Sequence, residues 1–188
     1  MKPVFVLFVA LSAGLAGFAA GCRATAAFDG SRRGGLAEEI IAEWPAPARL
    51  AAAAMLEKYG PPDALAADGL GWKDKGRWKK IIVRGSPGTA AGASGVLEQT
   101  AAYRVPPGTR DELAAFGDKV TVSPDWTRIS ARSNDEALNF LALNLAVAIG
   151  RGDLDAPGAR ASYKRAVDLS NAGKSSALMK ELLFPPIP

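Results

Sequence analysis

Hydrophobic residues form one continuous run at the start of the chain and shorter, periodic groups after it. The run extends from Val4 to Ala20, follows Lys2, and is interrupted only by Ser12 and glycines. A positive residue followed by an apolar stretch and small residues is the layout of a secretory signal peptide. A membrane-spanning helix needs about 20 apolar residues, more than this run supplies. We therefore expect residues 1–21 to be a cleaved signal peptide and the protein to be exported.

Farther along, apolar residues recur at the spacing of amphipathic helices, and capping residues, glycines and prolines mark the helix ends. The pattern predicts helices over the ranges 36–44, 48–59, 109–116, 134–149, 159–169 and 175–183. The helix at 134–149 is apolar on nearly all sides, which is typical of a helix buried in a core. Its apolar part would measure about 20 Å, which is too short to cross a bilayer. We expect it to be the central core helix, with the amides of Asn139 and Asn144 bonded to a neighbouring loop or strand end.

Between these helices, apolar alternation and turn residues predict strands over the ranges 70–73, 78–84, 96–105, 119–123 and 127–132. The strands form two hairpin-like groups, so we expect a small, mostly antiparallel sheet. Regular alternation along 78–84 places Trp78 and Lys80 on one face of the strand and Ile81 on the other. The pattern predicts a single α+β domain over residues 36–188, in which the sheet packs with the buried central helix and the flanking helices.

The stretch between the leader and the domain, residues 22–35, is small, polar and glycine-rich, and we expect it to be a flexible tether. It begins with Cys22, the only cysteine of the chain, so a disulfide within the chain is excluded. The sequence AAGC that ends at Cys22 resembles the lipobox of bacterial lipoproteins. In that family the cysteine thiol is acylated and the leader is cut immediately before it. The resemblance implies a lipid anchor at Cys22 and a place in the cell membrane or the outer membrane.

Two other fates of Cys22 stay open. Ala24, Thr25 and Ala26 form an A-x-A pattern that suits ordinary signal peptidase. A cut after Ala26 would discard the cysteine and release a soluble periplasmic or secreted protein. Alternatively, Cys22 is a plain thiol. Stable anchoring takes more than one acyl chain, and a triacylated Cys22 would meet that requirement.

The chain contains no histidine, which removes the commonest general base and the commonest metal ligand. Catalytic arrangements of the Ser-His-Asp and Cys-His kinds are excluded, and so are zinc sites of the usual Cys/His type. The adjacent acid pairs, such as Asp135 and Glu136, lie at expected helix N-termini, where negative charge stabilises the helix. The sequence therefore predicts a non-enzymatic protein with no cofactor and no bound metal.

The formal net charge is +4, and removal of Lys2 with the leader lowers it by one. This balance is too mild to indicate nucleic acid as a partner. The most distinctive surface candidate is the basic hairpin, which consists of Trp72, Lys73, Lys75, Arg77, Trp78, Lys79 and Lys80. One interpretation is contact with anionic envelope material such as lipid headgroups, with tryptophan at the interface. The other is an edge hairpin that its lysines protect from aggregation, with both tryptophans in the core.

Four segments resemble a family of uncharacterised exported bacterial proteins, many of which have lipoprotein leaders. They are AMLEKYGPPD (54–63), GRWKKIIV (76–83), LEQTAAYRVP (97–106) and NFLALNLAVAI (139–149). The resemblance covers residues 36–163 and implies export and a common fold, with no activity attached to it. Residues 49–83 are also similar to the small outer-membrane assembly lipoproteins of the SmpA/OmlA type.

These observations together predict an envelope-anchored bacterial lipoprotein, attached to the membrane through its lipid, whose domain binds or scaffolds an envelope protein or an anionic lipid. One alternative is a soluble exported protein, cut after Ala26, that binds a small ligand in a pocket beside the core helix. The other is a carboxylate-dependent hydrolase that acts on envelope sugars.

Overall fold

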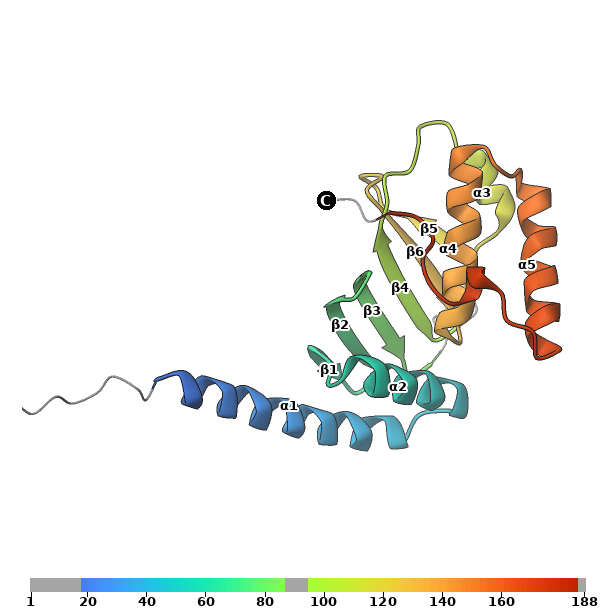
Figure 1. Ribbon diagram of the computed structural model, residues 1–188. Coiled ribbons are helices and arrows are strands. Elements are labelled where there is room, and N and C mark those ends of the chain that lie inside the picture. The colour runs from blue at the N-terminus through green and yellow to red at the C-terminus, as the bar shows by residue number, and fades with distance from the viewer. Residues whose placement is uncertain (1–17, 87–94, 186–188) are drawn as a thin grey trace, which may run out of the picture.

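A computed structural model describes residues 18–86 and 95–185, with side chains from residue 29 onward (Figure 1). Most of the expected signal peptide and the side chain of Cys22 lie outside this part of the chain. The described residues form an α+β fold in which helices cover one face of a single sheet. The predicted fold class is therefore confirmed.

Within the described residues, the sheet has six antiparallel strands in the order β1-β2-β3-β4-β6-β5. The strands are β1 (Ala64–Ala66), β2 (Gly69–Lys75), β3 (Trp78–Arg84), β4 (Leu97–Ala102), β5 (Val120–Val122) and β6 (Arg128–Ser133). β2 and β3 form the expected hairpin. β6 pairs with β4 on one side and with β5 on the other, which joins the two expected strand groups into one sheet.

The helices divide the covered face of the sheet between them. They are α1 (Phe18–Ala42), α2 (Ala46–Tyr59), α3 (Arg110–Phe116), α4 (Glu136–Arg151), α5 (Ala156–Asn171) and the 3₁₀ helix η1 (Ala177–Met179). α2 contacts β2, β3 and β4, and α4 contacts β4, β5 and β6, while α3 and α5 pack against α4. Every residue of α4 from Asn139 to Val147 is buried, so α4 is the central helix that the sequence predicts.

The hydrophobic core lies between the inner face of the sheet and the helices α2 and α4. One row of cross-strand partners on this face consists of Trp72, Ile81, Gln99, Ala131 and Val120, and all five are buried. Alternate strand residues thus meet the helices, which is typical of an antiparallel sheet covered on one side.

An irregularity in strand β3 overturns the expected regular alternation. Trp78 lies opposite Ala101 of β4, but Lys80 lies opposite Thr100, so the register shifts by one residue between them. A β-bulge of this kind adds one residue to a strand and re-aims the side chains beyond it. As a result, Trp78 shares the buried face with Ile81 instead of the exposed face with Lys80.

Residues 22–35 are helical in the structure, where the sequence suggests an irregular tether. They belong to α1. Alanine favours helix, and Asp29 and Arg33 form an ion pair one turn apart. Farther along α1, Ala37 is fully buried where the helix packs on α2 and β1. A helical spacer therefore stands in the position of the expected flexible segment.

The C-terminal tail, residues 177–185, is a strap over α4, and the expected terminal helix is reduced to the single turn η1. The Asn144 Nδ2 atom donates to the carbonyls of Leu178 (3.0 Å) and Glu181 (2.8 Å), and its Oδ1 accepts from the amide of Leu183 (2.8 Å). In the expected helix over 175–183, the carbonyl of Leu178 and the amide of Leu183 would be bonded internally. Asn144 takes the place of those helical bonds.

The other core amide, Asn139, joins α4 to the sheet. Its Nδ2 donates to the carbonyl of Leu97 (3.3 Å) and to Oε1 of Gln99 (2.9 Å). Its Oδ1 is buried and has no partner within the described residues. Asn139 therefore bonds a neighbouring strand and Asn144 bonds the tail, as the sequence predicts.

Candidate anionic-surface interface

The two tryptophans of the basic hairpin lie in the core. Trp72 is 0% exposed and Trp78 is 2% exposed. The indole Nε1 of Trp72 donates to the carbonyl of Gly60 (2.9 Å), and that of Trp78 donates to Oε1 of Glu136 (2.6 Å). The interpretation that places tryptophan at an anionic interface is wrong, because both rings face the helices and have polar partners there.

Three cations of the basic hairpin form ion pairs or hydrogen bonds near its turn. The Lys75 ammonium lies 3.9 Å from a carboxylate oxygen of Asp63, and the Lys79 ammonium lies 3.3 Å from Asp74. Arg77 donates to carbonyls of the C-terminal tail, at Leu182 and Phe184, and so holds the tail against the hairpin. These three side chains have contacts of their own within the domain. The arginine in particular has a structural role that the sequence pattern does not indicate.

The remaining two cations, Lys73 and Lys80, point away from the helices. They are direct cross-strand partners on β2 and β3, and both are exposed. Within the described part of the chain, neither forms an ion pair. They therefore mark the outward side of the sheet.

This outward side, which we call the open face, carries further basic residues from other strands. It consists of Gly69, Gly71, Lys73, Lys80, Ile82, Arg84, Glu98, Thr100, Ala102, Thr121, Arg128, Ser130 and Arg132. None of these residues is buried, whereas most of the strand residues that alternate with them, such as Trp72, Ile81 and Ala131, are buried under the helices. Five side chains of the open face are basic and one is acidic, so the face is positively charged.

The single carboxylate of the open face organises two of its arginines. Glu98 Oε2 accepts from Arg84 (3.2 Å) and from Arg132, its direct partner on β6. Burial alone would raise the pKa of Glu98, but the bonds and charges of Arg132 and Arg84 outweigh it and hold the pKa below its usual value. Glu98 is thus ionised at neutral pH and cancels one positive charge, while Lys73, Lys80 and Arg128 form no ion pair among the described residues.

Sequence reasoning missed three basic members of the open face, which are Arg84, Arg128 and Arg132. A local signal exists, since Arg128, Ser130 and Arg132 alternate with Ile129 and Ala131 along one strand. That signal says which residues share a face. It does not say that β6 pairs with β4, and this pairing is what brings its arginines onto the same surface as the hairpin lysines.

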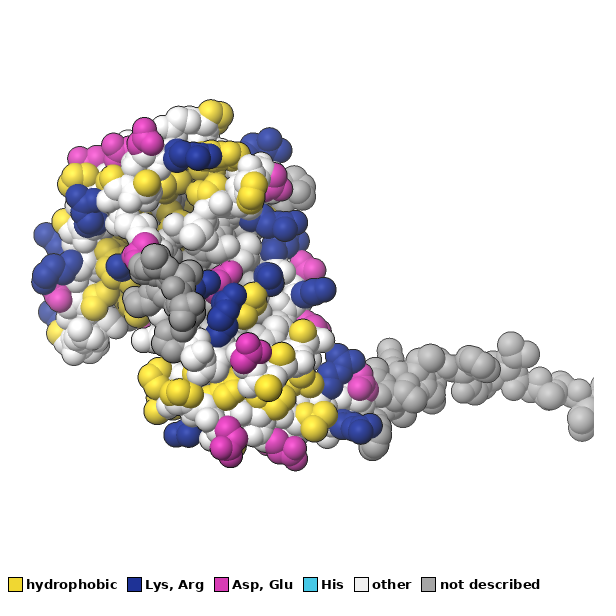
Figure 2. Space-filling model, turned by 180° about the vertical axis from the view of Figure 1, so that it is seen from behind, with side chains coloured by type: hydrophobic (Ala, Val, Ile, Leu, Met, Phe, Trp, Pro, Cys, Tyr) yellow, Lys and Arg dark blue, Asp and Glu magenta, His cyan; other side chains and the backbone are white. Residues whose placement is uncertain are grey.

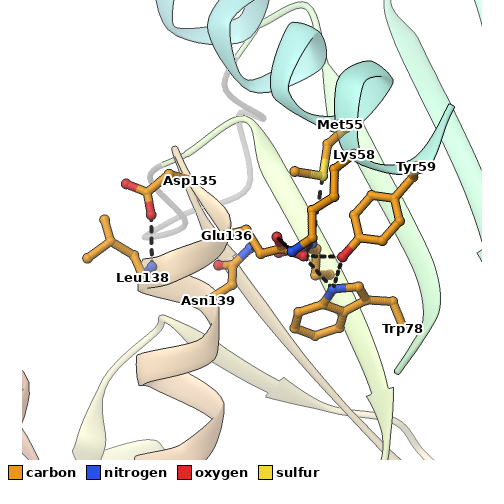
Figure 3. A network of polar contacts seen from close by, with 9 residues as sticks. Met55, Lys58, Tyr59, Trp78, Asp135, Glu136, Leu138 and Asn139 are labelled. Carbon is orange, nitrogen blue, oxygen red and sulfur yellow. Dashed lines mark hydrogen bonds and ion pairs between the residues drawn. The ribbon is translucent and has the colours of Figure 1, made fainter. Parts of the chain in front are cut away.

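A second polar cluster lies on the inner side of the sheet, around Glu136 (Figure 3). The Oε1 atom of Glu136 accepts hydrogen bonds from the Tyr59 hydroxyl (2.5 Å), Trp78 Nε1 (2.6 Å) and Gln99 Nε2 (2.9 Å). The Oε2 atom of Glu136 pairs with the Lys58 ammonium. The neighbouring acid points the other way in Figure 3, because it caps α4 through the amide of Leu138. Helix capping thus accounts for the presence of an acid at Asp135, but not for the one at Glu136.

The electrostatics of this cluster favour a carboxylate that is ionised at neutral pH. Burial alone would raise the pKa of Glu136, but hydrogen bonds from Lys58, Tyr59 and Trp78 outweigh it and lower the pKa. Burial, followed by the bond to the carboxylate, raises the pKa of Tyr59 well above its usual value. At neutral pH Glu136 has no proton to give, and both of its oxygens have partners. The cluster connects α2, β3, β4 and α4 and does not resemble an acid–base pair.

A groove of about 510 Å³ runs beside the Glu136 cluster, between α2 and the start of α4. Its lining is mostly apolar and includes Pro47, Leu50 and Met55, of which Leu50 is 70% exposed. Figure 2 shows hydrophobic side chains gathered low on the molecule, at the level of α1 and α2, with charged side chains of both signs around them. The groove has the size of a small-ligand site.

In the part of the chain that the structure covers, no group of three or more His, Cys, Asp or Glu residues is arranged to hold a metal ion. None of the helices described above combines the length and the apolar character needed to cross a membrane. No protein-family model, curated protein or solved structure is significantly similar to this chain.

Proposed function

We propose that this protein is an envelope lipoprotein, anchored through Cys22, whose domain binds the surface of an anionic phospholipid membrane with the open face of its sheet. The observation that carries the proposal is the composition of that face, which has five cations, one carboxylate and no covering helix within the described residues. A protein surface of this kind gains about 1 kcal/mol for each Lys or Arg held near an anionic leaflet.

The proposed anchor and the open face complement each other energetically. A single acyl chain binds a bilayer only marginally, and stable attachment takes a second chain or a basic patch. Acyl chains on Cys22 would keep the domain at the membrane, and the open face would decide which membrane surface it touches. The role is binding and not catalysis, which agrees with the lack of histidine and with the fully engaged carboxylate of Glu136.

The experiment is vesicle flotation of the mature chain, residues 22–188, with Cys22→Ser so that no lipid is attached. Vesicles of phosphatidylcholine alone are compared with vesicles that also contain phosphatidylglycerol. We expect recovery with the anionic vesicles only, and release at high salt because exposed charges are screened. Equal recovery with both kinds of vesicle would refute the proposal.

A matched pair of double variants locates the contact. Lys73→Gln with Arg128→Gln removes two positive charges from the open face, and Lys174→Gln with Lys180→Gln removes two exposed ones near the C-terminus. We expect the first pair to abolish most of the flotation and the second pair to leave it near the wild-type level. Equal losses would mean that only the overall charge matters.

The groove beside Glu136 supports a second candidate function, the binding of a small apolar ligand by a soluble exported protein. Ala54 lines the groove and is exposed, so Ala54→Trp fills it from the helix surface. If this function is the real one, thermal stabilisation by a bound apolar ligand disappears in Ala54→Trp and vesicle flotation is absent in the wild type.

A further inference from the structure

The open face is hollowed over strands β2 and β3. The hollow has a volume of about 240 Å³. Across the strands, Ala64, Gly71 and Ile82 stand in one row, and the missing side chain of the glycine leaves a gap between its two apolar neighbours. Lys73 and Lys80 form the next row along the strands and also line the hollow.

The backbone does not require glycine at this place. Gly69 and Gly71 do not adopt the left-handed conformation that other glycines of the chain show. A Cβ atom on Gly71 would lie 3.5 Å from the Cβ of Ala64, and one on Gly69 would lie 3.5 Å from the carbonyl oxygen of Val83. Both are ordinary contacts. Glycine inside a strand weakens the strand and often marks a site where a ligand approaches the backbone closely.

The lining of the hollow is almost wholly apolar, and its two lysines bring positive charge beside it. Like charges directly opposite each other across two strands are destabilising, and Lys73 and Lys80 occupy such positions with no ion pair in the described structure. An anion between the two ammonium groups relieves this repulsion. Asp63 also lines the hollow, but its carboxylate accepts the backbone amide of Lys73 (2.7 Å) and lies 3.9 Å from the Lys75 ammonium, so its charge is already partly compensated.

We propose that this hollow holds one anionic phospholipid headgroup. Lys73 and Lys80 pair with the phosphate, and the glycerol part of the lipid rests on Ala64, Gly71 and Ile82. This inference rests on the proposed function and adds to it a specific subsite. It accounts for the glycines and for the opposed lysines together, which general attraction to a charged surface does not.

The test is titration of the mature chain, with Cys22→Ser, by short-chain phosphatidylglycerol below its micelle concentration, followed by backbone amide NMR shifts. We expect saturable shifts at Gly69, Gly71 and Lys73. Lys80→Gln removes one charge-assisted bond and weakens the binding about tenfold. Short-chain phosphatidylcholine and inorganic phosphate are the comparison ligands, and binding of either as tight as that of phosphatidylglycerol would overturn the assignment to an anionic lipid.

A steric variant tests the hollow itself. Gly71→Val fills the gap and favours the strand, so the fold is kept, and we expect it to lose the saturable binding of phosphatidylglycerol. Thr121→Val, an exposed position of the same face on β5, is the control and should bind as the wild type does. If Gly71→Val binds normally while vesicles still recover the wild type, the subsite is wrong and the proposed function stands. If vesicles do not recover the wild type, the proposed function itself fails.

Discussion

Glu136 is the residue at which four elements of the fold meet. Its carboxylate binds Lys58 and Tyr59 of α2, Trp78 of β3 and Gln99 of β4, while its own backbone begins α4. A half-buried charge is tolerated only when it is paired and hydrogen-bonded, and here three donors converge on one oxygen. Loss of the charge would leave an indole, a hydroxyl and an amide facing a poorer acceptor.

The first prediction concerns this residue. Glu136→Gln keeps the size of the side chain but removes the charge and turns an amide group toward the donors. We expect it to lower the free energy of unfolding by about 2–4 kcal/mol, as measured by urea denaturation at neutral pH. The control is Asp135→Asn, which makes the same change of charge one residue earlier and retains a good N-cap. If both variants lose the same stability, Glu136 has no special role.

The second prediction is a pH dependence. The pKa values of Glu98 and Glu136 are lowered in the folded protein, so both groups contribute stability above the pKa of an unfolded glutamate, about 4.3. This contribution is lost as the pH falls through the lower, folded pKa values. We expect the free energy of unfolding to fall from neutral pH to about pH 3, and to fall less steeply in Glu136→Gln. If the free energy of unfolding falls equally steeply with pH in the wild type and in Glu136→Gln, the Glu136 carboxylate does not have this role.

At the scale of elements, periodicity and turn residues predict where most helices and strands lie, because these signals are local. The bulge in β3 and the strap at residues 177–185 cannot be predicted from local signals, because both depend on contacts with residues far away in the sequence. The alternation of Trp78 and Lys80 is broken by their pairing with β4. The tail loses its helix because Asn144, which is far away in sequence, binds its carbonyls. In both cases a distant partner decides a local conformation.

The third prediction concerns the strap. Asn144→Ala removes the two bonds to the tail carbonyls and the one from the amide of Leu183. At roughly 0.5–1.5 kcal/mol for each net hydrogen bond, we expect a loss of about 2–3 kcal/mol and faster hydrogen exchange at Leu183. Asn171→Ala, an exposed position at the end of α5, should change neither quantity by much. Unchanged exchange at Leu183 in Asn144→Ala would show that other contacts hold the tail.

At the scale of the whole molecule, the two sides of the sheet differ in how far the sequence predicts them. The inner side follows from hydrophobic residues such as Leu70, Ile81 and Leu97, whose need for burial fixes their direction. The open face has no such requirement, and its charge depends on strand order. Lys80 and Arg132 share it only because β4 stands between β3 and β6. The residues of the open face therefore come together through the strand order, which the sequence does not reveal. The residues of the core follow from the hydrophobic pattern of the sequence.

The last prediction concerns the lipid anchor at Cys22 and its place in α1. In the described backbone α1 continues from Phe18 to Ala42, so Cys22 stands about 22 Å along the helix from Ala37. Ala37 is the first buried residue of α1 among those from residue 29 onward. We expect the protein, expressed with its own leader in a bacterial host, to be recovered from membranes with an intact mass that starts at Cys22 and includes acyl chains. Cys22→Ser should abolish this species, and Ser31→Ala, a change in the same helix, should not. A soluble wild-type protein that starts at Ala27 would refute the anchor and leave the open face to act, if at all, from solution.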